Sequence, residues 1–416
     1  MTTSSPMQPV STLTAPDLKT VLLATGCVLT LAMGVRHGFG FWLQPISLSN
    51  GWTRETFSMA IAVQNLMWGV FGPFAGIAAD KLGTAKVIVL GAVLYALGLA
   101  WMALVTQPVL FVLGSGLLIG GALACTTFGA VSGIIGRTAP EAKRSWAFGM
   151  SSAASSFGQF VMMPVDQQLI QHAGWQTALY VLSAVILIVM LPMAWKLREP
   201  KLQAATGPQQ STMEAVREAF SHKPFLLLLS GYFVCGFQLV FIGVNMPAYL
   251  KDKGIVDPSI AVIALSLIGL FNIFGSYYAG KLGGLFPKRY LLSSIYLSRS
   301  IVIALFILAP LSSYSVYVFA AAMGLLWLST VPLTNGVIAG IFGVKYLSML
   351  SGFVFFSHQL GSFIGAWLGG YMYTKNGNYD AVWLIVIGLG LFATVINLPI
   401  DESAIERAPQ KPALAS

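Results

Sequence analysis

The stretch GIAADKLGTAKVIVLGAVLYALGLAWMALVT, residues 76–106, indicates the character of the whole chain. It begins with a short polar segment that holds Asp80, Lys81 and Lys86. From Val87 to Thr106 it then carries no Asp, Glu, Lys, Arg or His, which matches the ~20 mostly apolar residues that an α-helix needs to cross a bilayer. The segment does not alternate between apolar and polar residues, as the strands of a transmembrane barrel would. The pattern therefore predicts a membrane-spanning helix that follows a charged loop.

The composition extends this prediction to all 416 residues. Only 9% of them are charged and 56% are apolar, whereas soluble domains carry roughly 25% charged residues. A chain of this length with so few charges cannot cover a water-exposed surface, so a soluble enzyme is excluded. In lipid the backbone must satisfy its own hydrogen bonds, which favours an all-α membrane protein. The three cysteines lie inside apolar segments, with no spacing typical of zinc sites or disulfides.

Twelve stretches have the length and apolar character of spans. The first six lie near 20–43, 54–79, 86–106, 109–136, 146–169 and 176–196, and the second six near 224–249, 258–280, 290–309, 314–341, 347–373 and 380–400. This order predicts an N-terminal tail (1–19), a six-helix bundle (20–196), a linker (197–223), a second six-helix bundle (224–400) and a C-terminal tail (401–416). Within the linker, residues 211–221 are either a short amphipathic helix on the membrane surface or a plain tether.

The charges predict the orientation. If the N-terminus is cytoplasmic, 17 of the 23 Lys and Arg residues fall on the cytoplasmic side, and the outer loops hold only Arg54, Lys251, Lys253 and Lys375. The positive-inside rule then places both termini in the cytoplasm. The net charge of +9 is scattered among the span ends, so it indicates topology and no nucleic-acid partner.

The two halves of the chain also repeat. Several small residues recur 203 positions later, which is typical of transporters built from internal repeats. They are Gly149, Gly158, Gly174 and Ala178, which recur as Gly352, Gly361, Gly377 and Ala381.

The polar segment at 76–86 resembles the loop signature of the major facilitator superfamily, and a degenerate copy without the acidic residue follows at 280–289. The resemblance implies two pseudo-symmetric six-helix bundles that move by alternating access. It also implies a gating role for the loop residues Gly76, Asp80, Lys81, Gly83 and Lys86. An ordinary solvated loop charge is the simpler interpretation of Asp80.

A finer resemblance covers residues 38–45, 50–54 and 72–73, which are similar to bacterial monocarboxylate porters and oxalate/formate exchangers. Those families carry small organic acids, so the resemblance implies an organic anion as substrate. They are also marked by an arginine in the eighth span. Residues 258–280 contain none.

Two arginines fall inside predicted spans, where a charge is costly and therefore a functional hypothesis. Arg36 is preceded by Gly34, followed by His37, and lies toward the outer side. It either binds an anionic ligand together with His37, or is a structural arginine that reaches the interface. Arg299 lies near the middle of the ninth span, where substrate binding and bonding to backbone carbonyls or to Tyr296 are both open.

Uncharged polar residues complete the set of expected binding positions. His358 and Gln359 lie within the eleventh span, where the histidine either titrates near neutrality or only forms hydrogen bonds. Asp166 is the one carboxylate predicted to be embedded, so the candidates to carry a coupling proton are His358, Asp166 and the substrate carboxylate itself. The other candidates are Gln64, Asn65, Gln159, Gln238, Asn272, Tyr278 and Asn335.

The leading hypothesis is a secondary transporter for a small organic anion, such as a carboxylate, in a bacterial inner membrane, with proton symport as one coupling option. The alternatives are a carrier or exporter of an uncharged solute or drug, and a membrane-embedded sensor or enzyme on the same scaffold. The sequence shows no nucleotide loop or catalytic triad, and His37 and His358 alone are too few for a metal site. We therefore expect no enzyme activity, no cofactor and no metal. The expected partners are membrane lipid, the substrate and the coupling proton, with the chain acting as a monomer.

Overall fold

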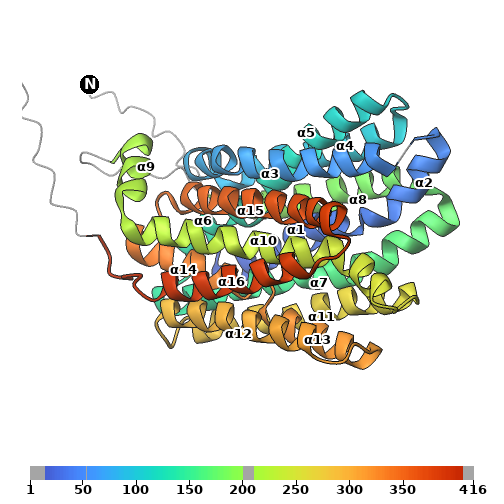
Figure 1. Cartoon of the computed structure of the whole chain (residues 1–416). Coiled ribbons are helices and arrows are strands. Elements are labelled where there is room, and N and C mark those ends of the chain that lie inside the picture. The colour runs from blue at the N-terminus through green and yellow to red at the C-terminus, as the bar shows by residue number, and fades with distance from the viewer. Residues whose placement is uncertain (1–14, 53, 200–209, 406–416) are drawn as a thin grey trace, which may run out of the picture.

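The computed structural model describes residues 15–52, 54–199 and 210–405, and all regular elements in these ranges are α-helices. The long helices run roughly parallel, and the short helix α9 lies across one end of the bundle (Figure 1). The helices are α1 (Leu18–Gly38), α2 (Gly40–Asn50), α3 (Arg54–Leu82), α4 (Thr84–Leu104), α5 (Pro108–Thr126), α6 (Phe128–Thr138), α7 (Glu141–Ala173), α8 (Trp175–Lys196), α9 (Thr212–Ser221), α10 (Lys223–Asp252), α11 (Pro258–Leu282), α12 (Lys288–Leu308), α13 (Ser313–Leu326), α14 (Thr330–Phe342), α15 (Leu347–Asn376) and α16 (Asp380–Asn397).

Each of the twelve predicted spans coincides with one helix or with two consecutive helices. Within the described ranges, eleven helical segments are long and apolar enough to cross a membrane by length and hydropathy alone. The predicted span that is not among them is α7, which buries polar side chains such as Ser152, Ser156 and Gln159. This helix packs against α1 and α11 in the middle of the bundle. Its polar residues therefore face protein, which explains its lower hydropathy.

Three of the predicted spans, the first, the fourth and the tenth, contain an interruption in their helical hydrogen bonding. In the first span α1 ends at Gly38 and α2 begins at Gly40, although Phe39 between them keeps helical backbone angles (φ −57°, ψ −24°). The fourth span is divided into α5 and α6 at Thr127, whose backbone is extended (φ −114°, ψ −167°). Next to this break, the Thr126 hydroxyl donates a hydrogen bond to the Ala122 carbonyl oxygen, and the Thr127 hydroxyl donates one to the Leu123 carbonyl oxygen. Such local bonds compete with regular helix hydrogen bonding.

The tenth span is interrupted between Leu326 and Thr330, where α13 ends and α14 begins. Side chains from other helices satisfy the exposed backbone. Asn272 Oδ1 on α11 accepts a hydrogen bond from the Leu328 N–H at 2.9 Å, and Arg299 on α12 donates to the carbonyl oxygens of Leu326 and Trp327. Unsatisfied backbone groups are costly at membrane depth, so these two side chains make the interruption stable.

Glycines that recur 203 positions apart lie at equivalent helix crossings in the two halves of the chain. A Cβ atom at Gly158 in α7 would collide with the Thr30 carbonyl of α1, and one at Gly361 in α15 would collide with the Phe233 carbonyl of α10. Thr30 and Phe233 are themselves 203 positions apart. The same close helix crossing therefore occurs in both halves of the chain, at positions that admit only glycine.

The two halves meet through α3 with α15 and through α7 with α11. At the end of the bundle that carries α9, called here the α9 end, backbone approaches backbone at Gly149 with Gly280 and at Gly72 with Gly352. Toward the opposite end, called the open end, α7 and α11 enclose a cleft of about 500 Å³. The halves are thus closely packed at the α9 end, and a cleft lies between α7 and α11 toward the open end.

Residues 211–221 form a helix and not a plain tether. Ser211 caps α9 by accepting a hydrogen bond from the Glu214 N–H, and the Glu214 carboxylate accepts one from the Ser211 N–H. Phe220 packs against Phe225 of α10 and Phe353 of α15. Gln210 accepts hydrogen bonds from Lys345 and Tyr346 through its carbonyl oxygen. These contacts hold α9 against the second half of the chain.

Candidate functional site

Arg36 lies close to the end of α1, on the side of the bundle that faces α3. Its Nη2 donates a hydrogen bond to Asn65 Oδ1 at 2.7 Å, and its guanidinium lies 5.8 Å from the centre of the Phe39 ring. The Nε–H group is buried and has no hydrogen-bond partner among the described residues. Part of the guanidinium therefore has unused donor capacity, and a planar fork of this kind suits a carboxylate.

Asn65 connects Arg36 to the second half of the chain. Its backbone oxygen accepts a hydrogen bond from Gln359 Nε2 of α15 at 3.3 Å, and the Gln359 side chain packs on Gly69, one turn further along α3. The structure thus brings Arg36, Asn65 and Gln359 together, as residues from three helices. His37 is half-buried beside them, and its Nδ1 contacts the Met33 carbonyl oxygen at 2.6 Å.

Aromatic rings continue this site along α3 and α15. Trp68 lies 4.6 Å from Phe355 between ring centres, Phe355 stacks on His358 at 5.4 Å, and His358 lies 5.2 Å from Tyr232 of α10. His358 Nδ1 also contacts Ser362 Oγ at 3.3 Å and Gln359 Oε1 at 3.4 Å. His358 is therefore held in one ring orientation, between aromatic faces and next to Gln359.

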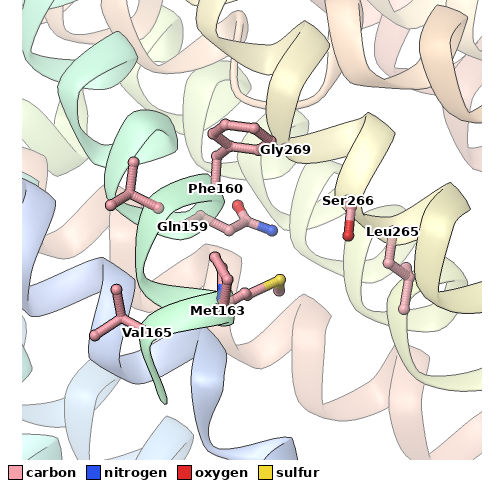
Figure 2. Close-up of a pocket in the computed structure, with 9 residues that line it drawn as sticks. Gln159, Phe160, Met163, Val165, Leu265, Ser266 and Gly269 are labelled. Carbon is pink, nitrogen blue, oxygen red and sulfur yellow. The ribbon is translucent and has the colours of Figure 1, made fainter. Parts of the chain in front are cut away.

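The cleft at the open end is mostly apolar. Gln159 reaches into it from α7, and Ser266 faces it from α11 (Figure 2). Its walls otherwise consist of Phe160, Val161, Met163, Pro164, Val165, Leu265 and Gly269. An amide and a hydroxyl thus provide the polar groups in an apolar cleft between the two halves.

Asn272 lies in a hydrogen-bonded cluster that joins the halves. Its Nδ2 donates to Ser156 Oγ of α7 at 2.8 Å, and its Oδ1 accepts from Ser276 and from the Leu328 N–H. Ser152 and Ser276 form a second bond across the same interface at 3.1 Å. Asn272 is fully buried, so this amide uses its hydrogen bonds within the protein.

Arg299 is fully buried behind the tenth span. Its Nε and Nη2 bind the Leu326 and Trp327 carbonyl oxygens at 2.5–3.1 Å, and Nη1 donates to Cys235 Sγ and Gln238 Oε1 at 3.3 and 3.5 Å. Gln238 Nε2 in turn donates to the Val386 carbonyl. Protein atoms therefore surround both Arg299 and Gln238.

The remaining predicted residues are spread over the bundle. Gln64 is buried, and its Oε1 has no partner within the described part of the chain. Asn335 accepts a hydrogen bond from Ser351 near the α9 end. Tyr278 is 55% exposed and packs on Tyr277, so the structure does not bring it to Arg36. Asp166 is buried against Gly38 of α1.

The loop residues differ sharply from one another. Asp80 accepts a hydrogen bond from the Met349 N–H at 2.9 Å and pairs with Arg137 at 3.4 Å. Gly76 packs on the backbone of Ser348 and Met349, and Gly83 has a positive φ of 92° that suits glycine. Lys81 and Lys86 are exposed. We call the contact of Asp80 with Met349 and Arg137 the Asp80 latch.

Sequence reasoning missed four side chains that the structure places in these clusters: Arg137, Tyr232, Ser276 and Phe355. Aromatic residues are common throughout the spans, so Tyr232 and Phe355 had no distinguishing signal. Ser276 could have been found as the hydroxyl residue one turn after Asn272.

Comparison with known proteins gives the family. The sequence pattern of the Major Facilitator Superfamily matches residues 23–332. The chain is 30% identical to monocarboxylate transporter 13 of Rattus norvegicus, over 94% of this chain and 91% of that protein. It is 23% identical to the uncharacterized MFS-type transporter YcxA of Bacillus subtilis strain 168, over 93% and 96% of the two chains.

Solved structures share the fold. The crystal structure of FucP in the outward conformation matches with a TM-score of 0.71 at 17% identity, covering 90% of this chain and 97% of FucP. The proton:xylose symporter XylE matches with a TM-score of 0.66 at 14% identity, covering 91% and 94%. The chain is therefore an integral membrane transporter, not an enzyme, and it belongs to the Major Facilitator Superfamily.

Proposed function

We propose that this protein is a secondary transporter that moves a small organic anion, such as a carboxylate, by alternating access. The observation that carries the proposal is the Arg36 guanidinium, which is fixed on one edge by Asn65 and whose Nε–H has no partner among the residues that the structure describes. A carboxylate is the partner that best satisfies such a group, because it accepts parallel N–H bonds and neutralises the charge.

The surroundings of Arg36 support an organic anion. His37, Asn65 and Gln359 supply neighbouring hydrogen-bonding groups, and the rings of Trp68 and Phe355 supply apolar surface about one helical turn away. Several relatives are named monocarboxylate transporters, with the numbers 11, 12 and 13, and these names agree with this substrate class. In this proposal a proton is the coupling ion, and His358 or Asp166 carries it.

One observation favours an uncharged solute instead. The cleft at the open end is lined by apolar side chains, with Gln159 and Ser266 as its polar groups. A neutral apolar compound would suit that cleft, and it would bind without help from Arg36.

We place the protein in a bacterial inner membrane as a monomer, with the α9 end in the cytoplasm. The support is the excess of Lys and Arg at that end, including Lys81, Lys86, Arg137 and Lys288. The described cleft then opens to the outside.

A thermal-shift screen of the purified protein tests the substrate class. The panel contains monocarboxylates, dicarboxylates, amino acids, sugars and uncharged aromatic compounds. A ligand at one hundred times its Kd stabilises the folded state by ~2.7 kcal/mol if it binds only that state. We expect carboxylates to raise Tm and their uncharged amides to leave it unchanged. A shift with the amides and not with the acids would favour the neutral-solute alternative.

A further inference from the structure

Another cavity, of about 870 Å³, lies at the α9 end, where the loop from α3 to α4 meets the last turn of α8 and the residues that follow it. Both acids that line it pair with one arginine of α6: Asp80 lies 3.4 Å from Arg137, and Glu199 lies 3.0 Å from it. Three further cations line the same cavity, and we call them the basic cluster: Lys81, Lys86 and Arg198. The cavity therefore carries a net positive charge.

The basic cluster is available to a ligand. Lys81, Lys86 and Arg198 are exposed, and no acidic side chain in the described ranges forms an ion pair with them. The Arg198 guanidinium lies over the Trp195 ring, 3.3 Å from its centre. A guanidinium that stacks by its face keeps the N–H groups at its edges for an anion. Three cations with free donors thus border one cavity.

The corresponding end of the second half has no such free charge. Arg289 follows Lys86 by 203 positions, which is the interval of the glycine repeat. Glu402 follows Glu199 by the same interval. The Glu402 carboxylate accepts hydrogen bonds from the Arg289 N–H at 2.7 Å and from Lys288 Nζ at 3.3 Å. Because Glu199 is turned toward Arg137, the start of α4 lacks the acid that neutralises the start of α12.

The cavity continues into an apolar, exposed wall. Val89 of α4, Leu191 of α8 and Trp195 of α8 line it, and Trp195 is 66% exposed. Exposed apolar side chains on the outside of spanning helices contact lipid, and tryptophan is enriched where the bilayer meets water. The cavity therefore lies where the apolar spans of α4 and α8 meet their charged ends, at the depth of the lipid headgroups.

We propose that this cavity binds the phosphate headgroup of an anionic phospholipid, whose acyl chains lie against α4 and α8. Lysine and arginine side chains donate strong, charge-assisted hydrogen bonds to phosphate oxygens. Basic pockets beside spanning helices are suited to anionic headgroups. A soluble anion would use the basic cluster and not the apolar wall, whereas an uncharged lipid would use the wall and not the cluster. An anionic phospholipid uses both, and its binding does not depend on what the transporter carries.

Native mass spectrometry of the purified full chain in detergent tests the proposal, with phosphatidylglycerol as the anionic lipid and phosphatidylcholine as the zwitterionic one. We expect wild type to bind one phosphatidylglycerol more tightly than phosphatidylcholine. Each basic residue near an anionic lipid contributes roughly fivefold in affinity. Lys86→Gln should therefore weaken phosphatidylglycerol binding about fivefold, and the triple variant Lys81→Gln, Lys86→Gln, Arg198→Gln roughly a hundredfold.

Two variants are controls. Lys86→Arg keeps the charge and should bind phosphatidylglycerol like wild type. Arg289→Gln removes one positive charge at the repeat-related position, and we expect it to leave the affinity unchanged. The side chains of the basic cluster are exposed, so the triple variant should keep a Tm close to wild type. If it does not fold, the comparison of Lys86→Gln with Lys86→Arg and Arg289→Gln tests the proposal.

Three results would overturn the proposal. The first is equal phosphatidylglycerol affinity in wild type and in the variants that lose charge from the basic cluster. The second is equal affinity of wild type for the two lipids. The third comes from a competition with inorganic phosphate or glycerol 3-phosphate at the concentration of the lipid. We expect neither to displace phosphatidylglycerol, and displacement would assign the cavity to a soluble phosphate.

Discussion

Asp80 and Met349 are 269 positions apart in the chain, yet the Asp80 carboxylate accepts a hydrogen bond from the Met349 backbone N–H at 2.9 Å. The bond joins the end of α3 to the first turn of α15, where unpaired N–H groups and the helix dipole favour a negative charge. Arg137 stands on the other side of the carboxylate, and Ser348 Oγ accepts a hydrogen bond from the Gly133 N–H close by. These contacts stabilise the state in which the halves meet at the α9 end.

The first prediction concerns the Asp80 latch. Asp80→Ala removes a charged acceptor worth about 1.5–3 kcal/mol, which corresponds to roughly a tenfold to hundredfold change in the population of the closed α9 end. Spin labels at Leu82→Cys and Leu285→Cys, two exposed positions on opposite halves, would report the separation in a Cys27→Ser background.

Glu199→Gln is the matched control for the latch. Glu199 pairs with the same Arg137 at 3.0 Å, but Arg137 belongs to the first half and Glu199 to the start of the linker, so this pair does not join the two halves. We expect this variant to leave the distance distribution unchanged. Equal distributions in Asp80→Ala and wild type would show that the latch does not hold the α9 end closed.

The second prediction concerns anion binding at Arg36. Removing one partner of a buried hydrogen-bonded charge pair costs about 2–5 kcal/mol. Arg36→Ala should therefore weaken carboxylate binding by a factor of roughly thirty or more. Arg36→Lys should bind with intermediate affinity, because it keeps the charge and loses the planar fork. Isothermal titration calorimetry on folded variants measures both effects, with Arg198→Ala as a surface-arginine control. Unchanged affinity in Arg36→Ala would refute the anion site.

Asn65 provides a sharper version of this test. Asn65→Asp places a negative charge next to Arg36 Nη2, where it would compete with a substrate carboxylate. Asn65→Ala removes the hydrogen bond without adding a charge. We therefore expect the aspartate variant to bind carboxylates more weakly than the alanine variant. If the ligand is uncharged, its affinity should not be lower in Asn65→Asp than in Asn65→Ala.

The third prediction concerns the interrupted tenth span. Arg299→Met leaves the Leu326 and Trp327 carbonyl oxygens without their donor, and each buried unsatisfied group costs about 1–3 kcal/mol. We expect a clear loss of thermal stability in Arg299→Met and a smaller loss in Arg299→Lys. Arg289→Met, near the helix start at the α9 end, serves as a comparison. If Arg299→Met keeps wild-type Tm but loses ligand affinity, Arg299 belongs to the binding site.

The fourth prediction concerns orientation. The exposed residues Met213 on α9 and Val256 before α11 lie at opposite ends of the bundle. In a Cys27→Ser background, we expect a cysteine at Val256 to react with a membrane-impermeant thiol reagent in intact cells. A cysteine at Met213 should react only after the membrane is opened. The reverse pattern would place the α9 end outside. The linker position Gln209, predicted to be cytoplasmic, lies outside the described residues.

The sequence alone determined where the chain crosses the membrane. A spanning helix satisfies its backbone within its own segment, so apolar length and the charges at its ends suffice to locate it. The predicted range 86–106 became α4, Thr84–Leu104, for this reason. The glycine repeat likewise marked the crossings at Gly158 and Gly361, because close backbone approach leaves a local signature.

Only the tertiary structure decided how the polar residues are used. The sequence does not indicate that the tenth span is interrupted. The interruption at Leu326–Leu328 depends on a donor from α12, Arg299, and an acceptor from α11, Asn272. The contact of Asp166 with Gly38 likewise depends on how α7 crosses α1, and this crossing leaves the Asp166 carboxyl without a hydrogen-bond partner in the described part of the chain. Hydrogen bonds between helices join residues far apart in the chain, so their partners are fixed by packing and not by local sequence.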